Sequence, residues 1–136
     1  MTDADELLTR LKALSMTSEF NNWLGLEIVS ASPGEAELHL RWRAEFGQYS
    51  GFLHASIVGG LIDTACGCAA FTLSGPVLAS QFSVRCLRPA VADLFVVKGR
   101  VLKPGRQQIF ASAELFGIDA PTRLLAVGDA VLVPGA

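Results

Sequence analysis

Basic residues are few in this sequence. The chain has 11 Lys and Arg against 13 Asp and Glu, which gives a formal net charge of -2 at pH 7. Proteins that bind DNA or RNA carry a positive stripe or patch that attracts the phosphate backbone. Because the sequence has no such excess, it predicts no nucleic-acid partner.

Cysteine is also sparse, and its arrangement predicts neither a disulfide framework nor a metal site. Three cysteines are present, Cys66, Cys68 and Cys86, and an odd number cannot pair completely. The Cys66-Gly67-Cys68 segment has no second cysteine pair and no histidine at metal-ligand spacing. We therefore expect small, buried, free thiols in a reducing compartment, and no metal ion or cofactor.

The sequence shows no pattern typical of a leader peptide or a membrane segment. Its start, Met1–Glu6, is acidic and precedes an amphipathic stretch, whereas a signal peptide begins with basic residues and continues with apolar ones. Asp63 and several glycines interrupt the longest apolar region, so we expect no bilayer-spanning run. The expected location is the cytoplasm, without a membrane role.

Charged residues of both signs together make up only 18% of the chain, and hydrophobic residues make up 51%. The length of 136 residues fits one domain over residues 1–136, with an N-terminal helical extension at about residues 3–24. A short chain with such an apolar composition has more apolar surface than its own core can bury, which indicates that part of this surface is buried against another subunit. The prediction is a homodimer or a homotetramer.

The first third of the chain predicts two helices followed by a β-hairpin. Leucines at helical spacing predict a helix over Ala4–Leu14, and a shorter one is predicted at Glu19–Leu24. Extended patterns at Glu27–Val29 and Ala36–Trp42 flank Ser32-Pro33-Gly34, which is typical of a tight turn.

The longest predicted element is a helix over His54–Leu73, which follows a loop at Phe46–Phe52. It contains no proline and ends at Ser74-Gly75-Pro76. Its apolar residues repeat with a period near 3.6, which predicts a helix largely enclosed by other elements. This stripe consists of Ile57, Leu61, Ala65, Cys68 and Thr72.

Four strands are predicted after this helix, joined as an antiparallel meander. Lys103-Pro104-Gly105-Arg106 has proline and glycine where a type II turn needs them, and Gly117–Pro121 supplies the next reversal. The order of elements indicates an α+β domain. The strands are expected at Val77–Leu87, Asp93–Leu102, Gln108–Phe116 and Thr122–Val133.

Asp63 is an isolated carboxylate in the long predicted helix. Inside an apolar stretch an unpaired carboxylate costs several kcal/mol unless it is solvated or hydrogen-bonded. Its helical neighbours Gly59, Gly60, Cys66 and Gly67 are small, which leaves a groove where a substrate arm or another backbone can lie. The alternative is a solvated aspartate, or one that caps a neighbouring loop.

The loop before this helix supplies backbone hydrogen-bond donors. Gln48–Ser56 runs directly into the helix, whose first N–H groups have no intrahelical partner and lie at the positive end of the helix dipole. Such groups can hold a developing oxyanion. The N–H of Ala55 is the candidate donor.

A polar amide at Gln48, a histidine that opens the helix at His54 and an acid at Asp63 give the sequence a specific resemblance. It is similar to the hotdog-fold thioesterases of the phenylacetate-degradation (PaaI-like) type. The segment Phe82–Ala90, in which a proline follows a leucine-arginine pair, adds to this resemblance, which covers about Asn22–Val133. It implies a curved antiparallel sheet wrapped around a long central helix, and hydrolysis of an acyl-CoA thioester to free acid and CoA.

The resemblance also implies a role for each matching residue. Asp63 corresponds to the general base or nucleophile, and Gln48 to the amide that holds water or substrate. The Ala55 N–H corresponds to the donor that binds the thioester oxygen, and His54 is given an orienting role. The family usually has His-Gly-Gly where this chain has His54-Ala55-Ser56, so a methyl group lies close to the thioester and alters the shape offered to the substrate.

Three further residues are candidates for substrate binding. Ser80 is the possible substitute for a hydroxyl that often assists the acid in the family, because Gly67 stands one turn after Asp63. Arg85 and Arg88 are candidates for the phosphates of CoA, which guanidinium groups bind well.

Two other functions stay open. A non-catalytic acyl-CoA binder or regulator would keep the pocket and lose the chemistry, and the altered His54-Ala55-Ser56 sequence is compatible with it. A hotdog hydratase or dehydratase would need its own histidine and acid pair, but the other histidine, His39, lies on the polar face of a predicted strand.

Helix geometry predicts that the active site is shared between subunits. If Ala55 and Asp63 lie on one continuous helix, their eight-residue separation places them about 12 Å apart along its axis. A general base must come within hydrogen-bond distance of the water that attacks the polarised carbonyl. We therefore expect Gln48 and Ala55 of one subunit to face Asp63 of the partner subunit, at two equivalent sites.

Overall fold

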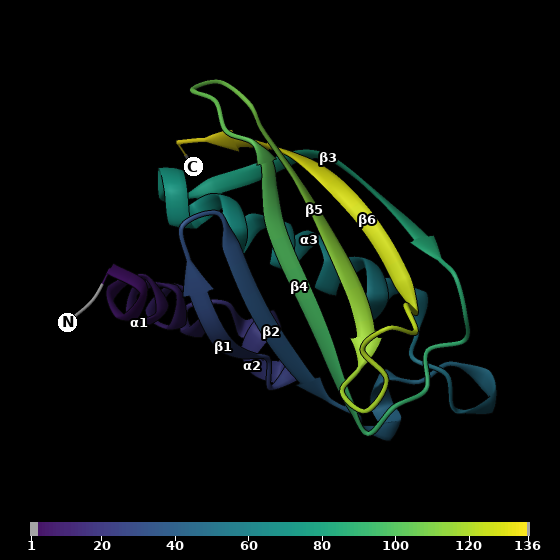
Figure 1. Cartoon of the computed structure of the whole chain (residues 1–136). Helices are drawn as coiled ribbons and strands as arrows, with labels where there is room; N and C mark the ends of the chain where they lie inside the picture. The colour runs from purple at the N-terminus through teal and green to yellow at the C-terminus, as the bar shows by residue number, and fades with distance from the viewer. Residues whose placement is uncertain (1–2, 136) are drawn as a thin grey trace.

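A six-stranded antiparallel sheet curves around one long helix in the computed structural model, which describes residues 3–135 (Figure 1). The long helix is α3 (Ala55–Ser74), and the strands lie side by side in the order β1-β2-β4-β5-β6-β3. The predicted α+β class and the long helix wrapped by a curved sheet are confirmed. The strands are β1 Glu27–Ser32, β2 Glu35–Arg41, β3 Val77–Cys86, β4 Leu94–Lys103, β5 Ile109–Gly117 and β6 Ala126–Pro134.

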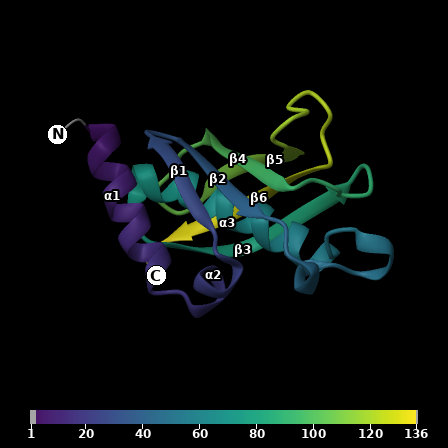
Figure 2. The same cartoon turned by 90° about the horizontal axis from the view of Figure 1, so that it is seen from below.

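Two helices precede the sheet, as the leucine spacing predicts. Helix α1 covers Asp3–Met16 and α2 covers Glu19–Leu24, the bounds predicted for the second helix. Figure 2 shows α1 alongside β1. Leu11 and Leu24 are 1% and 3% exposed, so both helices contribute to the core that α3 and the sheet enclose.

The first hairpin is confirmed. Strands β1 and β2 pair antiparallel and are joined through Pro33 and Gly34. Gly34 has φ 83°, a left-handed conformation that favours glycine at a tight turn. Strand β1 runs on to Ser32, three residues beyond its predicted end.

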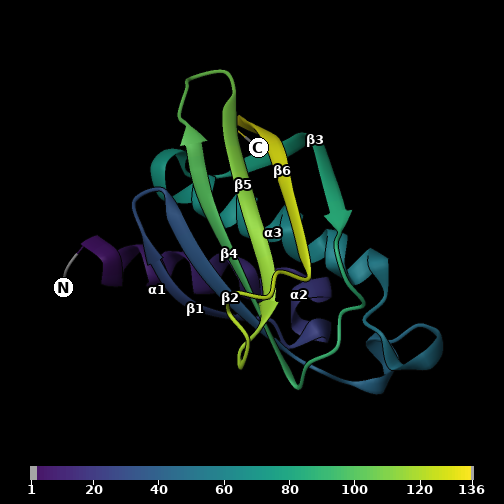
Figure 3. The same ribbon diagram turned by 45° about the vertical axis from the view of Figure 1, so that its right-hand side comes forward.

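The predicted meander of four consecutive strands is wrong, because the first of these strands has a different neighbour. Strand β3 does not pair with β4. It pairs with β6 at the far edge of the sheet, while β4 lies between β2 and β5 (Figure 3). Consecutive strands often pair, but the connection over residues 87–93 is longer than a hairpin turn and can cross the end of the sheet. It is fixed there by the Leu53 N–H, which donates to the Ala90 carbonyl at 3.0 Å.

The type of one predicted turn and the start of the last predicted strand are also wrong. Gly105 does not adopt the positive φ that a type II turn needs at this position. Strand β6 begins at Ala126 and not at Thr122, because the chain is still turning before it. The Arg123 N–H closes that turn by donating to the Ala120 carbonyl at 3.0 Å.

Helix α3 buries one face and leaves the opposite face partly open. Leu61, Ile62 and Ala65 are no more than 1% exposed, whereas Asp63 is half-buried. The prediction of a largely enclosed helix therefore holds for the face toward the sheet. The sequence predicted no bilayer-spanning run, but α3 is long and apolar enough to cross a membrane by length and composition, with a mean hydropathy of 1.5. In this structure the apolar face of α3 forms the core.

Helix α3 lies very close to the sheet at Gly99 of β4. A Cβ atom at Gly99 would lie 2.2 Å from the carbonyl oxygen of Ala65. A similar close approach occurs on β6, where a Cβ atom at Gly128 would lie 2.6 Å from Ile62 Cγ2. Gly99 lets the backbone of α3 lie directly on β4, and Gly128 makes room for the Ile62 side chain on β6. Together they fix the rotation of α3 about its axis.

Gly99→Ala is expected to lower the free energy of unfolding by about 2 kcal/mol or more, because the helix must move away from the sheet to admit the methyl group. Chemical denaturation measures this. The matched control is Gly67→Ala, whose Cβ would lie 3.9 Å from Leu132 Cδ2, an ordinary contact. This change should raise stability by about 0.5–1 kcal/mol. Equal stability of Gly99→Ala and the wild type would show that the helix is not seated on β4 in this way.

Candidate active site

The loop that precedes α3 is held by backbone hydrogen bonds at both of its ends. The His54 N–H donates to the Phe46 carbonyl at 2.8 Å, and the Gln48 N–H donates to the Phe52 carbonyl at 2.8 Å. Between these bonds, Ser50 and Gly51 adopt positive φ values of 64° and 77°. The loop is therefore a defined turn that leads into the first residues of the helix.

Arg43 joins this loop to α2, a role that the sequence did not reveal. Its guanidinium carbon lies 4.3 Å from the ring centroid of Phe46 and 5.4 Å from that of Trp23. Its Nη2 also donates a hydrogen bond to the Trp23 carbonyl. Stacking of this kind stabilises a partly exposed guanidinium. The contact depends on segments twenty residues apart, so no local sequence pattern could have shown it.

The start of α3 presents a free backbone donor. His54 is the N-cap, and its Nδ1 accepts a hydrogen bond from the Ser56 N–H at 3.0 Å. Neutral imidazole therefore carries its proton on Nε2. Among residues 3–135, no acceptor pairs with the N–H of Ala55, which lies at the exposed, positive end of the helix dipole.

Gln48, Ala55 and Arg88 line one pocket of about 330 Å³ at this end of α3. The guanidinium of Arg88 donates to the Leu124 carbonyl, which holds the side chain against the β5–β6 loop. The structure thus brings together three residues singled out from the sequence: an amide, a backbone donor and a cation.

Asp63 lies elsewhere, in a second cavity of about 520 Å³ between α1, α2, α3 and the start of β3. Burial raises the pKa of its carboxyl above the ordinary value. The predicted open groove is found only in part. Gly67 lines the same cavity as Asp63, but aromatic rings cover the other two glycines: a Cβ atom at Gly60 would lie 3.6 Å from the Phe20 ring, and one at Gly59 would lie 3.8 Å from the Phe82 ring. Cys66 does not belong to this groove, because its side chain is fully buried in the core.

The cysteines near Asp63 are not poised to act as nucleophiles. Burial, with the Asp63 charge as a further cause, raises the pKa of the Cys66 and Cys68 thiols to about 12. Both therefore stay protonated at neutral pH, and a thiol is a much weaker nucleophile than a thiolate. All three cysteines are free, but Cys86 is exposed, which corrects the expectation that it is buried.

The two groups of site residues are separated along α3. Ala55 and Asp63 are both on this continuous helix, so about 12 Å along the axis lies between them. They also line different cavities. One chain therefore does not bring the acid to the backbone donor.

Two candidate substrate-binding residues line neither of these cavities. The Ser80 hydroxyl donates to the Val131 carbonyl at 3.3 Å, and Ser80 sits at a bulge of β3, next to Ala79, which lines the Asp63 cavity. Arg85 lies on the face of the sheet opposite α3, because the adjacent Val84 pairs with Gly128, whose Cα faces the helix.

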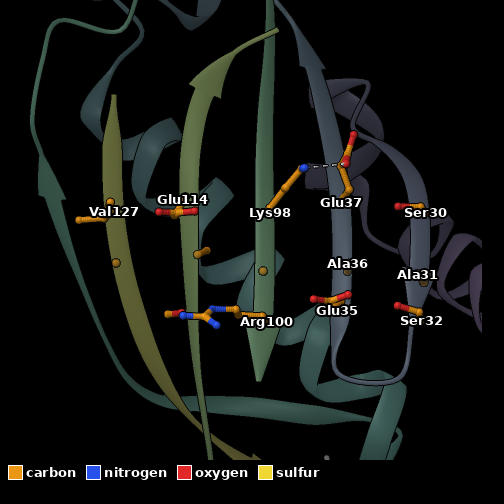
Figure 4. Close-up of a pocket in the computed structure, with 14 residues that line it drawn as sticks. Ser30, Ala31, Ser32, Glu35, Ala36, Glu37, Lys98, Arg100, Glu114 and Val127 are labelled. Atoms are coloured by element: carbon orange, nitrogen blue, oxygen red, sulfur yellow. Dashed lines mark ion pairs between the residues drawn. The ribbon is translucent and has the colours of Figure 1, made fainter. Parts of the chain in front are cut away.

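A third hollow lies on the outer face of the sheet (Figure 4). It has a volume of about 460 Å³, and its charges are partly paired, since Lys98 Nζ lies 3.7 Å from Glu37 Oε1. This hollow contains none of the site residues predicted from the sequence. In the part of the chain that the structure describes, no cluster of three or more His, Cys, Asp or Glu side chains could hold a metal ion.

Comparison with known proteins identifies the family. Residues 50–121, more than half of the chain, match the model of the family described as the thioesterase superfamily. A solved thioesterase family protein from Silicibacter pomeroyi is 33% identical, with a TM-score of 0.88 over 93% of this chain and 96% of that one. PaaI of E. coli, from the phenylacetic acid degradation operon, is 18% identical but has a TM-score of 0.90 over 99% of this chain and 97% of its own, which shows a shared fold.

A sequence relative points in the same direction. A Saccharolobus solfataricus protein named as an esterase is 25% identical over 109 residues, which cover 79% of this chain and 78% of the relative. The chain therefore belongs to the thioesterase superfamily, and its curved sheet and long central helix form the hotdog fold that this family shares.

Proposed function

We propose that the protein hydrolyses an acyl-CoA thioester to a free acid and CoA, with Asp63 as the catalytic carboxylate. The observation that carries this proposal is the placement of Asp63. It is a half-buried carboxylate with a raised pKa on the open face of α3, and it borders a cavity large enough for an acyl group. Membership of the thioesterase superfamily supports the same chemistry.

The reaction needs a polarised carbonyl and an activated water. The free N–H of Ala55 donates to the thioester oxygen and stabilises the oxyanion that forms when water attacks the carbonyl carbon. Asp63 accepts a proton from that water as the new C–O bond forms, and the proton later reaches the departing CoA sulfur as the C–S bond breaks. Direct attack by the Asp63 carboxylate, followed by hydrolysis of the anhydride, gives the same products.

The distance along α3 requires two copies of the chain for one site. In this arrangement Gln48 and Ala55 of one subunit meet Asp63 of the partner subunit. Exposed aromatic rings lie against α3 one turn before Asp63, with Phe20 48% and Phe82 47% exposed. Strand β3 pairs with β6 on one side and forms an edge of the sheet on the other. An apolar rim beside an unpaired strand edge is a surface suited to a second subunit.

His54 and Arg88 have supporting roles in this proposal. The His54 ring caps the helix through Nδ1 and so fixes the turn that presents the Ala55 N–H. Arg88 borders the same pocket as Ala55 and is the cation best placed to meet a phosphate of CoA there.

Asp63→Asn is expected to keep the fold and the oligomer while turnover of acyl-CoA falls by about two to four powers of ten, the usual contribution of a positioned base. Thiol release from a panel of acyl-CoAs measures this, with circular dichroism and sedimentation as controls. A folded Asp63→Asn protein with wild-type turnover would remove Asp63 from the mechanism. If the wild type binds acyl-CoA but releases no thiol, the protein is a binder and not an enzyme.

The raised pKa of Asp63 predicts how activity and stability depend on pH. Since a base acts only when ionised, kcat/KM should fall as pH drops through a value above 3.8, the ordinary aspartate pKa. The fold favours the protonated carboxyl, and this stabilisation is lost as pH rises through the raised pKa. Asp63→Asn should therefore have a higher Tm than the wild type at neutral pH, and the difference should shrink in acid. A fall of kcat/KM only at or below pH 3.8, together with equal Tm values for Asp63→Asn and the wild type at neutral pH, would contradict this prediction.

A further inference from the structure

The cavity beside Asp63 continues from the carboxylate into an apolar space that the N-terminal helices border on one side. Leu11 and Leu14 of α1 form one wall, and Phe71 of α3 and Leu132 of β6 form others. Leu11 is 1% exposed and belongs to the folded core, whereas Leu14 lies at the surface end of this wall. Helices α1 and α2 lie outside residues 50–121, the part of the chain that matches the family model.

The polar residues of this wall are bonded among themselves. Asn21 Nδ2 donates to Ser15 Oγ at 3.2 Å, and the Asn21 N–H donates to Ser18 Oγ at 3.1 Å. The Thr17 hydroxyl donates to the Leu14 carbonyl at 2.6 Å. Since these groups have local partners, a hydrocarbon chain can lie against them without leaving them unpaired.

The size of the cavity indicates the length of chain that it accepts. Its floor on α3 runs from Asp63 to Phe71, eight residues or about 12 Å along the helix axis. A fully extended chain advances about 1.2 Å per bond, so this distance corresponds to about ten bonds. The volume of about 520 Å³ is more than three times the roughly 150 Å³ of an engineered apolar cavity that holds benzene.

We propose that this cavity is the acyl site, that it takes a medium-length acyl chain of roughly eight to ten carbons, and that α1 and α2 set the limit on chain length. This inference rests on the proposed thioester hydrolysis, because it places the thioester next to Asp63. The acyl chain then runs along α3 toward Phe71, between the helix and the wall formed by Leu11 and Leu14.

Gly67 offers a way to fill the cavity without disturbing the core. It lies one turn beyond Asp63 on the cavity floor, and its Cβ would be in ordinary contact with Leu132. Gly67→Leu should lower the ratio of kcat/KM for decanoyl-CoA to kcat/KM for butyryl-CoA by about tenfold or more, since each methylene lost from an apolar site weakens binding several-fold. An unchanged ratio would overturn the assignment of the cavity.

The role of the N-terminal wall is tested by a matched pair of truncations. Leu14 and Leu73 are 45% and 46% exposed, but only Leu14 lines the cavity. Leu14→Ala should lower the ratio of kcat/KM for decanoyl-CoA to kcat/KM for butyryl-CoA several-fold. Leu73→Ala should leave this ratio at the wild-type value. Equal effects of the two changes would show that α1 does not contribute to the choice of acyl chain.

A binding measurement separates this inference from the proposed function. S-decyl-CoA is a thioether that cannot be hydrolysed, so calorimetry with this compound does not depend on catalysis. The wild type should bind S-decyl-CoA more tightly than CoA. In Gly67→Leu the ratio of these two affinities should be smaller by a factor of about ten or more. This result would support the cavity even if no acyl-CoA were hydrolysed. Equal affinity of the wild type for S-decyl-CoA and CoA would overturn the inference.

Discussion

The direct contact between the backbone of α3 and strand β4 is the constraint on which the rest of the structure depends. Gly99 allows it, because any side chain there would collide with the carbonyl of Ala65. Once Ala65 faces the sheet, every other residue of the helix has a fixed direction. Asp63 precedes Ala65 by two residues, a rotation of about 200°, so it must face away from the sheet. A contact in the core thus determines where the acid of the candidate site points.

The same continuous helix separates the two halves of the proposed site. Its first N–H group is the natural place to bind a carbonyl oxygen, and its open face near the middle holds the carboxylate. A rigid helix cannot shorten the distance between Ala55 and Asp63, so a second copy of the chain is the simple way to complete the site. The exposed rings of Phe20 and Phe82 beside Asp63 give that copy an apolar surface to cover. The proposed mechanism therefore links oligomerisation to catalysis.

The sequence predicted what is encoded locally. The bounds of α2, those of α3 to within one residue, the first hairpin and the isolated position of Asp63 follow from periodicity, turn residues and small neighbours. The neighbour of β3 could not be predicted, because it depends on where residues 87–93 cross the sheet, and no turn signal specifies that crossing. The fixation of the loop by Arg43 and the cavity wall formed by Leu11 were also missed, because both arise from contacts between distant segments. The leucine spacing of α1 was the one available signal, since it required an apolar partner that the sequence did not name.

The central claim, that each site combines residues of two subunits, is tested most directly by refolding Gln48→Ala and Asp63→Asn chains together in equal amounts. A mixed dimer would contain one intact site and one doubly damaged site. Random pairing makes about half of the dimers mixed, so activity should return to about a quarter of the wild-type value under two-fold symmetry. Native mass spectrometry confirms the mixed dimers, and each variant refolded alone is the control. If mixed dimers form and activity stays at the level of the single variants, the shared site is wrong.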